Sequence, residues 1–120
     1  NIRLESVQNA VEQSKIVANN ICGISKSYEN VPWFWSDQYD AKLKIAGIKE
    51  GYDYQIQLGS VKKSSFSIIS LKEDKVICIE SVNRSSDFTL AKKLIASQKV
   101  MPKKILVNSK KLLKEIMVNT

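Results

Sequence analysis

The fold is decided by residues 65–82, which read SFSIISLKEDKVICIESV. Two runs rich in Ile, Val and Ser, residues 65–71 and 75–82, flank the charged segment KEDK at 72–75. Short apolar runs separated by a polar turn are typical of a β-hairpin. These residues therefore predict two antiparallel strands joined by a tight turn.

Two segments on the N-terminal side of the hairpin also look like strands. Residues 41–47 (AKLKIAG) and 54–59 (YQIQLG) alternate apolar with polar or basic side chains. A period of two is the pattern of a strand with one face exposed. Together with the hairpin, these segments predict a four-stranded antiparallel meander over residues 41–82.

Helices are predicted on both sides of this sheet. Ser6 can cap a helix over residues 7–21, whose apolar side chains recur at helical spacing, and Gly23 supplies the usual stop. Residues 86–97 predict a second helix, and residues 109–116 predict a third. The predicted class is α+β, an antiparallel four-stranded sheet with the last two helices packed on one face and the first helix lying apart.

The aromatic residues gather in residues 31–40 (VPWFWSDQYD), which contain both tryptophans of the chain. Three consecutive rings point in different directions, so we expect at least one of them to lie on a loop. Two interpretations stay open. The cluster is either a core plug at the entrance of a domain or a surface that stacks on a flat conjugated ligand.

The charge of the chain is uneven. The formal net charge is +7; residues 1–60 carry six basic and seven acidic side chains, whereas residues 61–120 carry thirteen basic and five acidic ones. Such asymmetry suggests an acidic partner. A lysine-rich surface that is simply solvated is the plain alternative.

Several kinds of chemistry are excluded by composition. The chain has no histidine, and its two cysteines, Cys22 and Cys78, are too far apart for a metal or dithiol motif. The four glycines form no phosphate-binding loop. The sequence thus predicts no catalytic residue and no metal site, and the chain reads as a piece of a longer protein. Free cysteines fit a reducing cytoplasm, and no apolar run reaches the ~20 residues that span a bilayer.

Four blocks of the chain together resemble one family. They are residues 3–13 (RLESVQNAVEQ), 32–40 (PWFWSDQYD), 51–53 (GYD) and 81–84 (SVNR). In this order they resemble the C-terminal part of the FAD-dependent NAD(P)H:ferredoxin reductases of oxygenase systems. The resemblance implies that residues 1–30 end an FAD-binding domain, as its last helix and a linker, and that residues 31–120 form the reductase C-terminal domain.

The resemblance implies an oxidoreductase function for the whole protein. Such a flavoprotein passes electrons from NAD(P)H through FAD to a two-iron two-sulfur ferredoxin, with its FAD and NAD domains upstream of this chain. The present domain would cover the flavin edge and dock the ferredoxin, and we expect it to be inactive alone. The missing histidine agrees with this, since the related disulfide reductases donate a histidine from their C-terminal domains.

Cofactor contacts are implied at two places. The first helix would point its N-terminus at the flavin, so that the backbone N–H groups of Val7 and Gln8 lie near the C2 carbonyl, where negative charge gathers on reduction. Trp35 would lie at the flavin edge, between the flavin and the docking surface. Trp33 and Phe34 would pack beneath it as core.

The resemblance also implies a docking surface for an acidic ferredoxin, made of four lysines. They are Lys15 in the first helix, Lys44 in the first predicted strand, Lys92 in the second helix and Lys114 in the last. As a group, these charges would raise the association rate more than they tighten the complex.

Two other functions remain as alternatives. Related flavoproteins use this layer for subunit contact, which would make the chain a structural or dimerisation domain. A basic nucleic-acid-binding module is less favoured, because Arg3 and Arg84 are the only arginines and the aromatic residues do not interleave with the basic ones. The choice between NADH and NADPH and the oligomeric state stay open.

Overall fold

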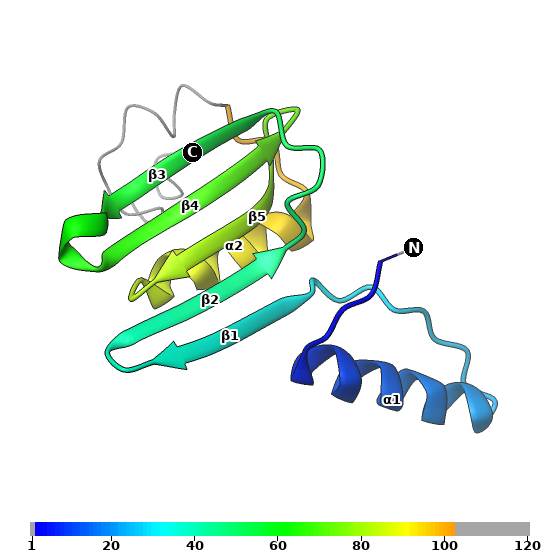
Figure 1. The fold of residues 1–120 in the computed structure, drawn as a ribbon. Coiled ribbons are helices and arrows are strands. Elements are labelled where there is room, and N and C mark those ends of the chain that lie inside the picture. The colour runs from blue at the N-terminus through cyan, green and yellow to red at the C-terminus, as the bar shows by residue number, and fades with distance from the viewer. Residues whose placement is uncertain (1, 103–120) are drawn as a thin grey trace.

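The computed structural model describes residues 2–102, which form an antiparallel sheet with one helix on a face and another beside its edge (Figure 1). The helices are α1 (Val7–Ile21) and α2 (Ser85–Ser97), and the strands are β1 (Trp33–Gln38), β2 (Ala41–Gly47), β3 (Tyr54–Ser60), β4 (Ser65–Lys72) and β5 (Lys75–Val82), with a short 3₁₀ turn η1 at Val61–Lys63. The predicted α+β class is confirmed. The helix expected at 109–116, and Lys114 within it, lie outside the described residues.

The order of the strands corrects the expected meander. The described sheet has five strands in the order β1-β2-β5-β4-β3, so β2 pairs with β5 and not with β3. Val76, Cys78 and Ile79 of β5 are all buried, and the backbone N–H and C=O groups of a buried strand need partners on both edges, which β2 and β4 supply. The connection over residues 48–53 therefore carries the chain past β5 and β4 to the opposite edge of the sheet (Figure 1).

Gly47 marks the point where β2 leaves the sheet. Its φ is +81°, and a Cβ placed there would lie 2.0 Å from the carbonyl oxygen of Ile77 in β5. Only glycine combines this backbone conformation with so close an approach. The neighbouring strand can therefore run alongside without a break.

The aromatic stretch forms the extra strand, so the expectation of a loop there was wrong. β1 is an edge strand that pairs with β2, and Trp35 lies opposite Lys44. Side chains alternate across a strand, which puts Trp33 and Trp35 on one face and Phe34 on the other. Phe34 is 42% exposed among the described residues, so it is not the core residue that we expected.

The hydrophobic core lies between the sheet and α2. Ile69 and Ile79 from the central strands, with Ala91 and Leu94 from the helix, are at most 1% exposed. Full burial of an isoleucine or leucine side chain contributes about 1.5–3 kcal/mol before conformational entropy is counted. This packing sets the position of α2 over β5 and β2.

A buried ion pair holds the N-terminal turn of α2. Asp87 is fully buried, and its Oδ2 accepts hydrogen bonds from Arg84 Nε and, at 3.0 Å, from Ser67 Oγ of β4. Oδ1 of Asp87 has no partner among the described residues. The carboxylate therefore ties the start of the helix to the middle of the sheet, near the positive end of the helix dipole.

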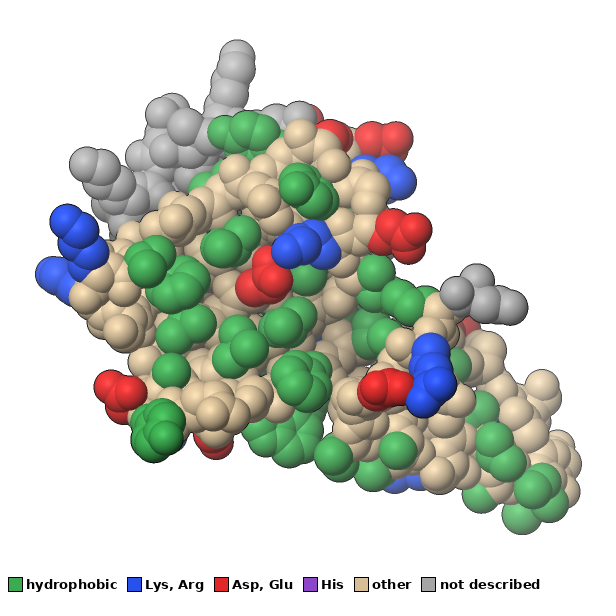
Figure 2. Space-filling view, viewed as in Figure 1, with side chains coloured by type: hydrophobic (Ala, Val, Ile, Leu, Met, Phe, Trp, Pro, Cys, Tyr) green, Lys and Arg blue, Asp and Glu red, His purple; other side chains and the backbone are tan. Residues whose placement is uncertain are grey.

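The other face of the sheet has no helix over it within residues 2–102, and Figure 2 shows hydrophobic side chains gathered there. The strand registers place Ile45, Glu80 and Ile68 in one row on this face. Glu80 pairs with Lys49 at 3.1 Å in the middle of the apolar surface. The hydrogen bond from Lys49 to Glu80 raises the pKa of that lysine.

The two cysteines differ sharply in environment. Cys22 is exposed, whereas Cys78 is 2% exposed, and its burial, helped by nearby Glu80, raises the pKa of its thiol to about 11. A thiol reacts as its thiolate, so at pH 8 we expect Ellman's reagent to label Cys22 quickly and Cys78 only after the chain is unfolded. The Cys22→Ser variant serves as control and should show no fast phase. Two fast-reacting thiols in the native protein would contradict the buried position of Cys78.

Candidate functional site

The N-terminus of α1 presents free hydrogen-bond donors. The N–H of Asn9 donates to the Oγ of the capping residue Ser6, and the N–H of Ala10 donates to the Ser6 carbonyl, both at 3.1 Å. The N–H groups of Val7 and Gln8 have no partner among the described residues. Free N–H groups at the positive end of a helix dipole favour an acceptor that carries negative charge.

A cleft of about 220 Å³ opens beside this helix terminus. It lies between the segment that enters α1 and the strands β1 and β2. Its lining residues include Leu4, Ser6, Pro32, Trp33, Phe34 and Ile45. Most of this lining is apolar and part of it is aromatic, which suits the edge of a flat conjugated ring.

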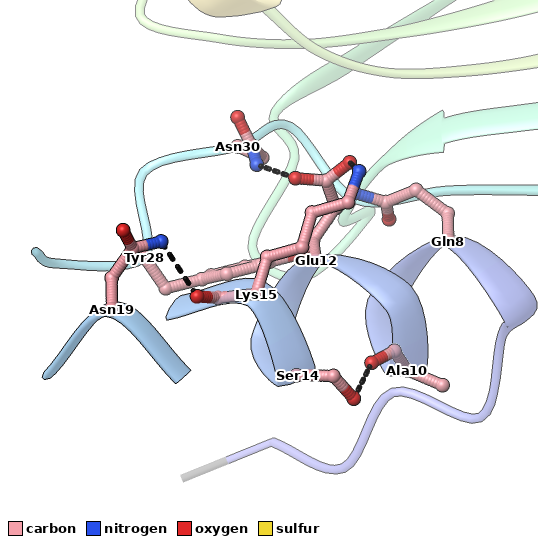
Figure 3. Close-up of polar contacts among 8 residues, drawn as sticks. All are labelled: Gln8, Ala10, Glu12, Ser14, Lys15, Asn19, Tyr28 and Asn30. Atoms are coloured by element: carbon pink, nitrogen blue, oxygen red, sulfur yellow. Dashed lines mark hydrogen bonds and ion pairs between the residues drawn. The ribbon is translucent and has the colours of Figure 1, made fainter. Parts of the chain in front are cut away.

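Polar contacts join α1 to the rest of the molecule, since none of its own residues is buried. The Oε1 of Gln8 accepts the backbone N–H of Trp33 at 3.3 Å, which occupies a donor on the open edge of β1. Figure 3 shows the carboxylate of Glu12 between Asn30, whose Nδ2 donates to it at 2.9 Å, and Lys15, at 3.8 Å. The helix therefore lies against β1 without becoming part of the core.

Rings and lysines from three elements meet on the α2 side of the sheet, and we call this group the ring–lysine cluster. Its members are Trp33 and Trp35 of β1, Lys44 of β2, and Phe88 and Lys92 of α2. The ring centroids of Trp33 and Trp35 are 5.3 Å apart, and those of Trp33 and Phe88 are 5.9 Å apart in an edge-to-face arrangement. The three rings thus form a continuous row from the strand edge to the helix.

Each lysine of the cluster lies over a ring. The Nζ of Lys92 is 4.9 Å from the centroid of Trp33, and the Nζ of Lys44 is 5.6 Å from that of Phe88. Lys44 Nζ also donates to Ser85 Oγ at 3.3 Å. Cation–π contacts of this length favour these positions of the ammonium groups. With Trp35 41% exposed, the cluster offers one flat ring and two fixed positive charges.

A groove of about 550 Å³ separates α1 from α2. Trp33 and Phe88 are among its lining residues, Lys92 and Lys93 line it from α2, and Glu12 lines it from α1. Lys15 is exposed and pairs with that glutamate, so an acidic side chain of its own helix offsets its charge. The structure thus brings Trp35, Lys44 and Lys92 together and leaves Lys15 on the helix across the groove.

Two contributors to the site escaped the sequence analysis. Phe88 lies within the predicted second helix, and no sequence signal shows that its ring would meet Trp33 and Lys44. The side chain of Gln8 was likewise not considered, because only its backbone N–H was expected to matter. If residues 33–38 had been taken as a strand that forms a hairpin with residues 41–47, the register would have placed Trp35 opposite Lys44.

Other kinds of site find no support in residues 2–102. No helix of this part is long and apolar enough to cross a membrane. Nor does it hold a group of three or more His, Cys, Asp or Glu side chains that could bind a metal ion.

Comparison with known proteins gives a consistent result. Residues 33–117 match a family model described as Reductase C-terminal. The chain is 43% identical over 97 residues to rhodocoxin reductase of Rhodococcus erythropolis, covering 81% of this chain and 23% of that protein. It is 42% identical over 97 residues to putidaredoxin reductase of Pseudomonas putida, with the same two coverages.

A solved structure agrees with the sequence matches. The covalent putidaredoxin reductase–putidaredoxin complex is similar to this chain with a TM-score of 0.87 and 39% identity, covering 98% of this chain and 28% of that chain. The chain therefore spans about a quarter of the length of the relatives that it matches.

Proposed function

The chain belongs to the reductase C-terminal family, found in the ferredoxin reductases of oxygenase systems, and from this premise we propose that it docks a ferredoxin for a flavoenzyme. The enzyme would be an NAD(P)H:ferredoxin oxidoreductase of the cytoplasm, and its acceptor an acidic two-iron two-sulfur ferredoxin. The observation that carries the proposal is the ring–lysine cluster, in which Trp35 and Lys44 lie directly opposite each other on neighbouring strands.

The cofactor side of the proposal rests on the start of α1. FAD, when bound, supplies a carrier that accepts two electrons from NAD(P)H and releases them one at a time. The free N–H groups of Val7 and Gln8 fit the pyrimidine edge of its ring system, where reduction adds negative charge. The cleft lined by Pro32 and Phe34 adds apolar surface beside them. Residues 1–30 would then complete the FAD-binding domain.

The docking side of the proposal rests on Lys44 and Lys92. Both ammonium groups are held over rings beside an exposed tryptophan, so an acidic surface would meet charges that need little reordering. Arrangements of this kind chiefly raise the rate of encounter. Lys15 and Lys114 remain proposed contributors, the first across the groove and the second outside the described residues.

Reversing the two central charges tests this function. In the whole enzyme, we expect the Lys44→Glu and Lys92→Glu double variant to raise the KM for ferredoxin about tenfold at low salt. Each ion pair between a lysine of this surface and an acidic group of the ferredoxin is worth roughly 0.5–1 kcal/mol. The increase should shrink towards 0.15 M salt, where the Debye length is ~8 Å. Reduction of ferricyanide, a small acceptor, should change little because it needs no matched surface.

A matched control lies at the opposite edge of the sheet. Lys62 and Lys63 of η1 are exposed next to β3, and their reversal changes the net charge by the same amount. If that variant raises the KM for ferredoxin as much as the first one does, net charge alone matters and the docking surface is refuted.

A further inference from the structure

We propose that Phe88 is a positioning residue of the docking surface, holding both the Trp35 ring and the Lys44 ammonium where the acidic ferredoxin meets them. This inference rests on the function proposed above. It concerns a residue of α2 that contributes through its neighbours, because its own side chain is 8% exposed.

The first step of the argument is the row of rings. Trp35 lies on an edge strand and is 41% exposed, and among the described residues its ring contacts one other aromatic ring, that of Trp33. Trp33 in turn packs edge-to-face with Phe88, and the two ring centroids are 5.9 Å apart. Edge-to-face and tilted ring pairs fix relative orientation as well as burying area. The plane of Trp35 therefore depends on Phe88 through one intermediate ring.

The second step is the position of the charge. A lysine side chain has several rotatable bonds, and an exposed one samples many of their rotamers. Lys44 Nζ lies 5.6 Å from the Phe88 centroid and donates to Ser85 Oγ, three residues earlier on the same helix. Without the ring, the hydroxyl alone would have to hold the ammonium group. Phe88 therefore selects the rotamer in which the charge lies by its own ring and by Ser85, on the face of the sheet that carries Trp35.

The third step is that Phe88 is itself rigidly placed. The preceding residue, Asp87, is fully buried and bound to Arg84 and to Ser67 of β4. A contact surface keeps its geometry when the residues that support it are locked in this way. The Phe88 ring thus connects both parts of the docking surface, the Trp35 ring and the Lys44 ammonium group, to the core of the domain.

The test compares three substitutions in the whole enzyme. Phe88→Leu keeps an apolar side chain and removes the ring, and Phe88→Tyr keeps the ring. Ile95→Val alters a side chain of the same helix that is also 8% exposed and carries no ring itself. We expect Phe88→Leu to raise the KM for ferredoxin about three- to fivefold, as the loss of a weak cation–π contact implies, with kcat and ferricyanide reduction unchanged. Phe88→Tyr and Ile95→Val should stay within about twofold of the parent enzyme.

A spectroscopic signature separates positioning from general stability. Phe88→Leu should change the near-ultraviolet circular dichroism of the coupled pair Trp33 and Trp35, and Ile95→Val should not. The inference is overturned if Phe88→Leu raises the KM no more than Ile95→Val does, or if Phe88→Tyr is as impaired as Phe88→Leu. Failure of the underlying function looks different, because then the charge-reversed enzyme would also bind ferredoxin normally.

Discussion

The Trp35→Ala variant of the whole enzyme should reduce ferredoxin with a kcat/KM about 30-fold lower than the parent. Trp35 offers a flat, 41% exposed ring at the edge of the sheet, beside Lys44. Aromatic residues at the centre of a docking surface contribute about 2 kcal/mol or more, and this free energy corresponds to about 30-fold. Electron transfer from NAD(P)H to ferricyanide and the FAD content should stay close to those of the parent.

Phe34 provides the matched control for this change. It is the adjacent residue of the same strand and is 42% exposed, but it points to the opposite face of the sheet. Because Phe34 lines the cleft proposed for the flavin, Phe34→Ala should lower ferredoxin and ferricyanide reduction together, whereas Trp35→Ala should lower ferredoxin reduction alone. If ferricyanide reduction falls as much as ferredoxin reduction in the Trp35 variant, the ring belongs to the flavin site and not to the docking surface.

A second large effect is expected on stability. Asp87→Ala should lower the free energy of unfolding by about 3 kcal/mol, because it leaves the guanidinium of Arg84, whose side chain is 16% exposed, without its carboxylate. It also leaves Ser67 without its acceptor. Urea unfolding of the purified chain measures this change as a lower midpoint with an unchanged slope.

Two smaller substitutions sharpen the test of Asp87. Ser67→Ala removes one neutral donor and should cost about 1–2 kcal/mol, less than the loss of the carboxylate. Arg84→Met removes the positive charge and keeps a long apolar stem, so Asp87→Ala should cost less in the Arg84→Met background than alone. Equal costs in both backgrounds would show that the ion pair does not carry the stability of the helix start.

The strands were well predicted wherever a pattern is local. The alternation of residues 41–47 and the charged turn at 72–75 gave boundaries that match β2 and the β4–β5 hairpin closely. The neighbours of each strand were not predictable in this way. The position of β5 between β2 and β4 depends on contacts between residues far apart in sequence, such as Leu43 with Val82.

The prediction of the candidate site had the same limit as that of the fold. The resemblance to a family supplied Trp35 as a candidate at the flavin edge and Lys44 and Lys92 as docking candidates, and the structure places these three side chains in one cluster. It did not supply the ring of Phe88 beneath Lys44, because a contact between a strand and a helix that are distant in sequence has no spacing to read. Phe34 was wrongly expected in the core. No strand was predicted over residues 33–38, so the alternation of side chains along β1 was not considered.

The central position of β5 has a consequence for the order in which the chain folds. The β1–β2 and β3–β4 hairpins are complete once residue 72 has been synthesised, but they have no strand to join them. Until residue 82 follows, β2 and β4 each keep one unpaired edge, and such edges invite pairing with other chains. Pairing β5 with β2 joins residues about forty positions apart in sequence, and such pairing is slower than the formation of either hairpin. Because α2 begins at Ser85, directly after β5, the apolar face can be covered as soon as the sheet is complete.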